Sequence, residues 1–382
     1  MLKFKFWLFP HLVTGIALIF SCSGPDSLSV PLISFTIPPD GFKVEVGKSL
    51  TLFPNVVNGD KSNFIWEVNG IIVSNDKSYT FTPSKIGHYS LQLKVSNDVG
   101  SDNKEIKISA FSNLSPFISK VFDYKYGPGQ HASLISSNWN GDDFIGQPWT
   151  GIKSYTSLGG WGGYIIAGFD HIVKNGDGAD FAIFTQPGPA SEPAVVYIMS
   201  DTNGDGIPND GEWSEIKGSE YNNPETIHNY QVTYYKPADN GNVTWKDNKG
   251  AKGILVPVFD TSSWWWSGYG NKTEVVFNGE KLPDAYKNIS TRADIENWIV
   301  RSGMFTFGYS ECYNNLDYNN SLKANILDIS DAVDNTGNKT KISGISFIKV
   351  QSGVFQIAGW LNEISPEISG AADLSLIEYT AN

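Results

Sequence analysis

Short runs of alternating apolar and polar residues recur through the first third of the chain and predict β-strands. In the clearest run, residues 42–46, the three apolar side chains would share one face and the two charged side chains the other, because successive strand side chains point to opposite sides. Turn signals such as Pro39-Asp40-Gly41 separate these runs. Strands at this spacing over residues 33–110 indicate an immunoglobulin-like β-sandwich.

The aromatic, glycine and alternating positions of this sandwich resemble the PKD family. The resemblance implies that Trp66 is the core tryptophan and that residues 89–95 form a central strand. PKD modules mostly act as spacers or docking modules, so we expect a structural stalk here. The positions that carry the resemblance are Trp66, Asn69, Gly70, Tyr79, Phe81, Gly87, His88, Tyr89, Leu91, Leu93, Val95, Ser96, Asn97 and Gly100.

Residues 111–382 continue as short strand-like runs and predict a second, larger β domain. The glycine-rich run 157–163 is followed by another strand pattern, not by a helix, so phosphate-cradle logic does not apply. We expect these glycines to allow close backbone approach or a bulge in a sheet. A single segment, residues 292–302, predicts a helix, with apolar residues at 295, 298 and 299 and Thr291 as its cap.

The order of motifs in this second domain is similar to that of PKD-containing cell-surface lipoproteins of Bacteroidetes-type bacteria, and more loosely to galactose-binding-like jelly rolls. The resemblance implies an all-β protein, a PKD sandwich followed by a jelly-roll-like domain with at most one or two short helices. Such proteins accompany outer-membrane nutrient transporters, so a binding role is implied without its cargo. The motifs are Ser-Leu-Gly-Gly at 157–160, Asp-Gly-x-Asp-Phe at 177–181, Ser-Glu-Pro at 191–193, and residues 344–353 and 359–371.

Composition excludes one class of partner and one means of stabilisation. The net charge of −12 and the lack of a basic stripe argue against nucleic acid, since phosphate binding requires clustered Lys and Arg. Only two cysteines occur, Cys22 and Cys312, so disulfides do not stabilise this fold. Cys312 has no adjacent basic residue to lower its pKa, and we expect a buried, inert thiol.

The N-terminus predicts a signal peptide and an anchor. Lys3 and Lys5 precede an apolar run at 12–20 that falls short of the roughly 20 residues a membrane span needs. Residues 19–22, Ile-Phe-Ser-Cys, resemble a bacterial lipobox, which implies cleavage after residue 21 and acylation of Cys22. An ordinary signal peptide with an incidental cysteine is the alternative. Residues 22–32 would then be a tether on an outer-membrane lipoprotein exposed at the cell surface.

A loop between two strand-like runs matches a calcium-loop pattern. Side-chain oxygens on alternate residues can converge on a hard cation, Gly206 permits the sharp turn, and Glu212 could close the site with both oxygens. Pro208 and the flanking strands argue against an EF-hand, so the hypothesis is a structural calcium site on a β-hairpin. The alternative is a polar turn. The expected ligands are Asp201, Asn203, Asp205, Ile207, Asn209 and Glu212.

Surplus tryptophans supply the candidate ligand-binding surface. In an extended run at 263–270, alternate tryptophans face opposite sides, and exposed Trp and Tyr stack on sugar rings or other flat ligands. Core or inter-domain packing is the alternative. Trp245 and Trp360 lie in strand-like runs and are expected in the core. The candidate residues are Trp264, Trp265, Trp266, Tyr269, Trp161, Trp139 and Trp149.

Catalytic patterns are weak. No His/Cys/Asp cluster has zinc-ligand spacing and no nucleophile elbow occurs, while Asp177, Asp180, Glu192, Glu220 and Glu225 could supply a glycosidase pair only as any long chain could. The leading hypothesis is therefore a non-catalytic surface lipoprotein that binds a glycan or similar nutrient beside a TonB-dependent transporter. The alternatives are a corrinoid (vitamin B12) binding lipoprotein, an adhesive or structural module that meets another protein, and a glycan hydrolase.

Overall fold

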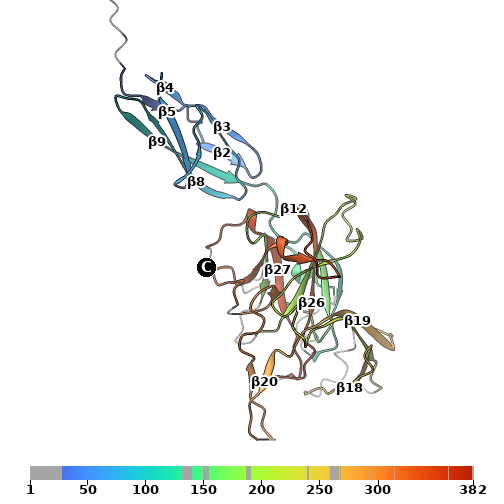
Figure 1. Ribbon diagram of the computed structural model, residues 1–382. Helices are drawn as coiled ribbons and strands as arrows, with labels where there is room; N and C mark the ends of the chain where they lie inside the picture. The colour runs from blue at the N-terminus through green and yellow to red at the C-terminus, as the bar shows by residue number, and fades with distance from the viewer. Residues whose placement is uncertain are drawn as a thin grey trace, which may run out of the picture. The chain divides into compact units, whose positions relative to one another are not determined.

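The computed structural model describes residues 28–130, 140–148, 155–185, 191–238, 241–258, 266, 268–292, 294–313, 315–359 and 361–380. The proposed signal peptide and Cys22 lie outside these residues. The chain divides into two compact units, one containing Thr51–Thr80 and Tyr89–Lys107, the other containing Ile108–Asn382 together with Asp40–Leu50 and Phe81–His88. Strands dominate both units, as the alternating sequence predicts (Figure 1). None of the helices among the described residues has the length and apolar content required to cross a bilayer.

The N-terminal sandwich is built around Trp66, as predicted. Its indole is fully buried, lies 5.7 Å from the ring of Tyr79 and 6.1 Å from that of Phe35, and donates a hydrogen bond to the carbonyl of Asp76 at 2.9 Å. The predicted central strand is confirmed as β8 (Gly87–Ser96), with buried Leu91, Leu93 and Val95 alternating with exposed residues. One sheet has the order β2 (Phe42–Glu45), β9 (Ser101–Phe111), β8, β5 (Asn63–Val68) and β6 (Ile71–Ser74), and two short pairs join β1 (Leu32–Ser34) to β4 (Asn55–Val57) and β3 (Leu50–Leu52) to β7 (Tyr79–Phe81).

The larger unit is a β-sandwich of two antiparallel sheets, in which β12 and β26 run side by side (Figure 1). The first sheet has the order β10 (Lys120–Lys125), β12 (Tyr164–Lys174), β26 (Gly344–Ser352), β14 (Ala194–Met199), β15 (Ser214–Ile216) and β25 (Ala332–Val333), with β22 (Tyr309–Ser310) also on β14. The second has the order β11 (Thr156–Ser157), β27 (Glu367–Asp373), β13 (Phe181–Thr185), β24 (Ala324–Leu327) and β23 (Tyr318–Asn319). Three short 3-10 helices have described bounds, η1 (Asp142–Phe144), η2 (Ile329–Asp331) and η3 (Leu374–Leu376).

The main core lies between these two sheets. Alternate positions of β14, such as Val196 and Ile198, meet Ile183 of the second sheet in a cluster of buried apolar side chains. The positions between them, such as Tyr197, point to the opposite side of the first sheet. The outer side of that sheet therefore lines one of the candidate sites described below, through Tyr197, Glu215 and Lys349.

The glycine-rich run forms a close backbone approach, as the sequence predicts. A Cβ atom added to Gly127 would lie 1.9 Å from the carbonyl oxygen of Gly160, and one added to Gly163 would lie 1.8 Å from that of Leu158. Gly159 also has φ +66°, a conformation that L side chains rarely adopt. No side chain could be accommodated at these positions without displacing the backbone.

A third antiparallel sheet carries a second, aromatic core. Its order is β18 (Lys252–Leu255), β17 (Val243–Asp247), β16 (Ile227–Tyr235) and β19 (Glu274–Lys281). Val232 and Tyr234 of β16 and Phe277 of β19 are buried here, and aromatic side chains from outside the sheet pack against them. The ring of Tyr234 lies 5.9 Å from that of Phe277, edge to face.

The predicted helix at residues 292–302 is wrong, because the segment belongs to a hairpin. β20 (Tyr286–Asn288) pairs with β21 (Trp298–Val300), so that Asn288 lies opposite Trp298. The side-chain oxygen of Asn288 accepts hydrogen bonds from the backbone N–H groups of Ser290, at 2.9 Å, and Asn297, at 3.1 Å. These bonds close the loop. The N–H of Asn297, which in a helix would donate to the carbonyl four residues earlier, donates to Asn288 instead.

Candidate ligand-binding groove

A groove of about 740 Å³ lies beside the third sheet and the β20–β21 hairpin. It is large enough for an extended small ligand, since typical ligand sites measure about 300–1,000 Å³. Its lining combines aromatic faces with polar side chains. The residues that line it are Ile227, Tyr230, Trp245, Asp247, Lys249, Ala251, Leu255, Lys281, Asp284, Tyr286, Lys287, Asn288, Trp298, Phe355, Gln356 and Ile357.

Two tryptophans supply the largest aromatic faces of the groove. Trp245 of β17 is only partly exposed, and its ring packs edge to face on Phe355 with a centroid separation of 4.9 Å. Gly253 lies opposite Trp245 on β18, where a Cβ would come within 2.6 Å of the indole, so glycine lets the ring lie close to the strand. Trp298 of β21 is also partly exposed, and its indole N–H donates to Glu296 at 2.8 Å.

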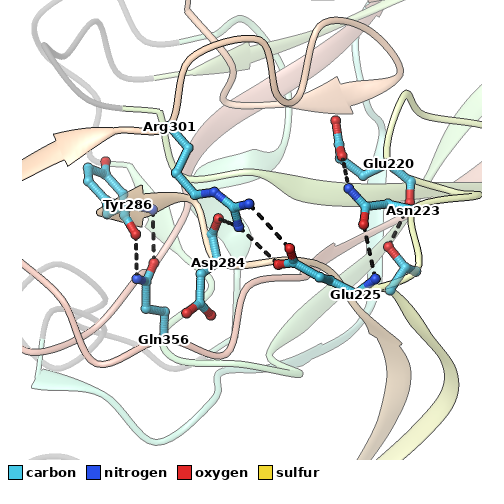
Figure 2. Close-up of polar contacts among 8 residues, drawn as sticks. Glu220, Asn223, Glu225, Asp284, Tyr286, Arg301 and Gln356 are labelled. Carbon is cyan, nitrogen blue, oxygen red and sulfur yellow. Dashed lines mark hydrogen bonds and ion pairs between the residues drawn. The ribbon is translucent and has the colours of Figure 1, made fainter. Parts of the chain in front are cut away.

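Gln356 connects the hairpin to the segment that follows β26. Its side-chain oxygen accepts from the backbone N–H of Tyr286 at 3.0 Å, and its side-chain nitrogen donates to the carbonyl of Tyr286 at 2.8 Å (Figure 2). The phenol of Tyr286 donates to the carbonyl of Ser191 at 2.9 Å. Backbone and side chain of Tyr286 are thus both held, which orients the ring in the groove.

An arginine holds the other side of the hairpin. Arg301 donates to both carboxylate oxygens of Glu225, at 3.0 and 3.3 Å, and to the carbonyl of Asp284 at 3.1 Å. Asn223 in turn accepts from the backbone N–H of Glu225 and donates to Glu220 (Figure 2). A two-pronged Arg–carboxylate pair restricts orientation as well as distance, so these contacts fix the position of the β20–β21 hairpin that lines the groove.

The structure places three of the predicted aromatic ligand residues in the aromatic core. Trp161 is 1% exposed, Trp266 4% and Tyr269 6%. Tyr269 stacks on Tyr126 at 4.5 Å, and the indole N–H of Trp266 donates to the carbonyl of Lys272 at 2.9 Å. These three residues therefore pack in the core, which was the alternative to a ligand-binding role. The remaining candidates, Trp139, Trp149, Trp264 and Trp265, lie outside the described residues.

Trp245 differs from its prediction in the opposite direction, from core residue to groove residue. The sequence places it in the core, but its ring is partly exposed and lines the groove. Trp360, the other expected core tryptophan, lies outside the described residues. The buried Cys312 thiol is confirmed at 1% exposure, and burial raises its pKa well above the usual range.

Several of the carboxylates considered for a glycosidase pair have structural partners. Asp180 accepts from the backbone N–H groups of Gly176, at 2.7 Å, and Ile329, at 2.9 Å. Glu220 accepts from the N–H of Phe305 at 3.0 Å, and Glu225 pairs with Arg301. These three side chains fix loops in place.

A buried carboxylate cluster was not visible in the sequence. Oxygens of Glu192, Glu311 and Glu367 lie within 4.8 Å of one another, although the residues come from three distant segments. Burial and the neighbouring carboxylates raise the pKa of Glu192 and of Glu311 well above the usual range. Glu192 accepts from the N–H of Ser365 at 2.7 Å, and Glu311 accepts from the N–H of Glu367, so the cluster joins strand ends.

The expected calcium loop is an exposed turn between β14 and β15. The two carboxylate oxygens of Asp201 accept from the N–H groups of Gly204, at 2.8 Å, and Gly206, at 3.0 Å. The expected closing ligand, Glu212, accepts from the side chain of Asn335 at 2.6 Å. A calcium site closed by Glu212 would have to exchange this hydrogen bond for the cation.

We expect calcium to raise the melting temperature of the full chain and a chelator to lower it. A loop of this kind binds at about millimolar calcium, and tenfold excess over Kd stabilises the folded state by about 1.4 kcal/mol. Differential scanning fluorimetry with and without calcium measures the shift. Glu212→Gln should remove it and Glu274→Gln, outside the loop, should keep it; equal melting temperatures in calcium and chelator would contradict the prediction.

Comparisons with known proteins give weak overall similarities. No curated protein matches the chain in sequence. A quinonprotein alcohol dehydrogenase-like protein of Bacteroides thetaiotaomicron is 14% identical, with 61% of this chain and 63% of that one covered and a TM-score of 0.21. SGBP-B of the Bacteroides ovatus mixed-linkage glucan utilization locus, solved with a mixed-linkage heptasaccharide, is 10% identical, with 66% and 98% covered and a TM-score of 0.20. A SusE-like protein is 9% identical, with 89% and 96% covered and a TM-score of 0.14.

At these TM-scores the superpositions transfer no function, and the chain spans less than two thirds of the first of these proteins. The N-terminal match is specific. A sequence model of the PKD-like domain matches residues 30–97, which include the buried Trp66 and the central strand β8. Residues 30–97 therefore form a PKD-like domain, followed in the same chain by a larger all-β unit.

Proposed function

We propose that this chain is a surface-anchored, non-catalytic lipoprotein that binds a glycan in the groove between the third sheet and the β20–β21 hairpin. The anchor is inferred from residues 1–22, and the PKD-like domain would act as a stalk. The observation that carries the proposal is the groove itself, in which Trp245, Trp298 and Tyr286 are partly exposed beside polar side chains.

Sugar rings match this combination of surfaces. One face of a pyranose presents C–H groups that pack on an aromatic ring, while its hydroxyls point outward to hydrogen-bonding groups. Aromatic anchors dominate binding energy because they bury much area with few rotatable bonds. Trp245 and Trp298 come from different sheets, so the groove suits a chain of rings better than a single ring.

The charges around the groove favour a neutral or acidic glycan. Three cationic side chains line the groove, Lys249, Lys281 and Lys287. Two carboxylates also line it, Asp247 and Asp284. Asp247 is already occupied, since it accepts from the phenol of Tyr230 at 2.6 Å and from two backbone N–H groups. The lysines therefore remain to donate to hydroxyls or carboxylates of a ligand.

Isothermal titration of the full chain against β-glucans, α-glucans, mannans and pectic oligosaccharides tests the proposal. We expect at least one oligosaccharide to bind without being cleaved. Release of reducing ends would contradict the non-catalytic role, and binding of a corrinoid with no glycan binding would favour that alternative cargo. A chain that captures only a protein partner would refute the glycan proposal.

A further inference from the structure

A second cavity, of about 390 Å³, lies on the other side of the β16–β19 strand pair from the groove. Ile227 pairs with Lys281 across these strands, and both line the groove. The residues adjacent to these two in the chain, His228 after Ile227 and Glu280 before Lys281, line the cavity. Glu280 and Lys281 are neighbours on β19 and point to opposite sides of it, and none of the described residues lines both sites.

The walls of this cavity consist of aromatic and polar side chains with no aliphatic ones. Such a lining suits a ligand that has both an apolar face and many hydrogen-bonding groups. The lining residues are Tyr197, Trp213, Glu215, Tyr221, His228, Asn229, Asn278, Gly279, Glu280, Asp334, Asn335 and Lys349.

A row of three side chains crosses the first sheet and forms part of the lining. Tyr197 of β14 lies opposite Glu215 of β15 on one side and opposite Lys349 of β26 on the other. Paired residues on neighbouring strands have Cβ atoms about 5 Å apart. Tyr197 therefore lies between Glu215 and Lys349 and separates the carboxyl group from the ammonium group. Each is therefore directed to the cavity independently.

Glu215 is buried without a partner. It is 7% exposed, yet its carboxyl group has no hydrogen bond or ion pair to any residue that the structure describes. Burial and the neighbouring Glu280 raise its pKa well above the usual range, which favours the protonated form, and a protonated carboxyl group can both donate and accept a hydrogen bond. The carboxyl oxygens are not among the buried side-chain atoms that lack a partner, so they are accessible from the cavity that Glu215 lines, and a ligand hydroxyl can replace water there.

Lys349 supplies donors at the other end of the row. Its ammonium group lies 4.9 Å from the ring centre of Tyr197 and 5.1 Å from that of Tyr164, and has no ion pair among the described residues. Burial lowers the pKa of Lys349 to about 8, against the raising effect of Glu280 and Asp123. The group is thus mostly charged at neutral pH, and the aromatic faces leave its N–H donors for a ligand.

A β-bulge in β16 holds the Glu280 side chain at the side of the cavity. His228 pairs with its carboxylate, and the backbone N–H of Asn229 donates to it at 3.4 Å. Asn229 has φ +53°, and the register of β16 against β19 shifts at this point. The bulge directs His228 toward Tyr221, whose ring centre lies 4.6 Å away.

The charges of the lining restrict the ligand. Lys349 disfavours a cation, while Asp334, whose hydrogen bonds lower its pKa, disfavours an anion. A neutral ring with several hydroxyls fits both conditions, since each hydroxyl can accept from Lys349 and exchange hydrogen bonds with Glu215. The partly exposed ring of Trp213 offers a face on which such a ring can stack, whereas the ring of Tyr221 is already in contact with His228 and Lys217.

We propose that this cavity is a second carbohydrate site, which binds one neutral sugar ring through Glu215 and Lys349. The proposal shares only its ligand class with the proposed function of the groove. Because the two sites lie on opposite sides of β16 and β19, a change at one can be made without touching the other.

Saturation-transfer NMR and calorimetry of the full chain with D-glucose, D-galactose, D-mannose and N-acetyl-D-glucosamine test this site. We expect at least one of these sugars to bind, Glu215→Ala and Lys349→Met each to weaken that binding at least tenfold, and Trp298→Ala in the groove to leave it unchanged. Absence of binding by all four sugars, or equal binding by wild type and both cavity variants, would overturn the proposal.

A blocking variant covers the case in which the buried substitutions do not fold. Asn278 is exposed on β19 at the mouth of the cavity, where a strand tolerates an aromatic residue, so Asn278→Trp should fill the mouth and abolish monosaccharide binding. Binding retained in this variant, or lost in Trp298→Ala instead, would assign the sugar to the groove and refute the second site. Oligosaccharide binding without monosaccharide binding would refute the cavity and leave the groove intact.

Discussion

Replacing Trp298 by alanine is expected to weaken glycan binding in the groove by roughly 5- to 150-fold, which corresponds to the about 1–3 kcal/mol that one aromatic stacking platform contributes. The indole is partly exposed and lines the groove from the β20–β21 hairpin. Because the ring is partly exposed and only packs against the edge of a buried cluster, the melting temperature should fall by less than it does when a fully buried tryptophan is removed. Calorimetric titration with the best oligosaccharide of the panel measures the effect.

Ile299→Ala is the matched control for this prediction. Ile299 follows Trp298 on the same strand, is 44% exposed and does not line the groove, since its side chain points to the opposite side. We expect its glycan affinity to equal that of wild type. If Trp298→Ala retains full affinity, or if both variants lose the same amount, the groove is not the glycan site.

Strand positions could be predicted where one face of a strand is buried and the other exposed. In β8, Leu91, Leu93 and Val95 are fully buried and alternate with exposed polar residues, which is the period-two signal that sequence alone carries. The glycine-rich run was also interpretable, because no helix pattern followed it. Both features depend on neighbours in the chain, which explains why the sequence was sufficient.

The predicted helix failed for the opposite reason. Three apolar positions at 295, 298 and 299 fit a helical face, but Ile299 and Val300 are exposed on β21, so the pattern did not report a buried face. The side chain of Asn288 and the pairing with β20 determine the local structure. Such tertiary contacts override a weak local preference.

The candidate sites could not be predicted, because they assemble residues from distant parts of the chain. Trp245, Tyr286, Trp298 and Phe355 reach the groove from four segments, and each looks like an ordinary strand residue in isolation. Counting tryptophans identified a plausible residue type but could not separate Trp161, in the core, from Trp298, in the groove. Burial is a property of the packed structure.

Replacing Trp161 by alanine is expected to destabilise the protein by about 3–5 kcal/mol, the usual effect of removing a buried tryptophan. Its indole is 1% exposed, packs edge to face on Tyr230 at 5.0 Å and donates to the carbonyl of Glu280 at 3.2 Å. Alanine would leave a cavity in the aromatic core and remove this hydrogen bond. For a unit of this size the melting temperature should fall by roughly 6–20 °C.

Thermal unfolding of wild type, Trp161→Ala and Trp298→Ala separates the two roles of tryptophan in this chain. Trp298→Ala should melt close to wild type, with a small loss from its packing against a buried cluster, and lose glycan affinity, whereas Trp161→Ala should melt far lower. Since Phe355 lies 5.9 Å from the ring of Trp161 and also lines the groove, some loss of affinity in Trp161→Ala is expected as well. A Trp161→Ala protein that melts with wild type but no longer binds glycan would instead make Trp161 a ligand residue, as the sequence first indicated.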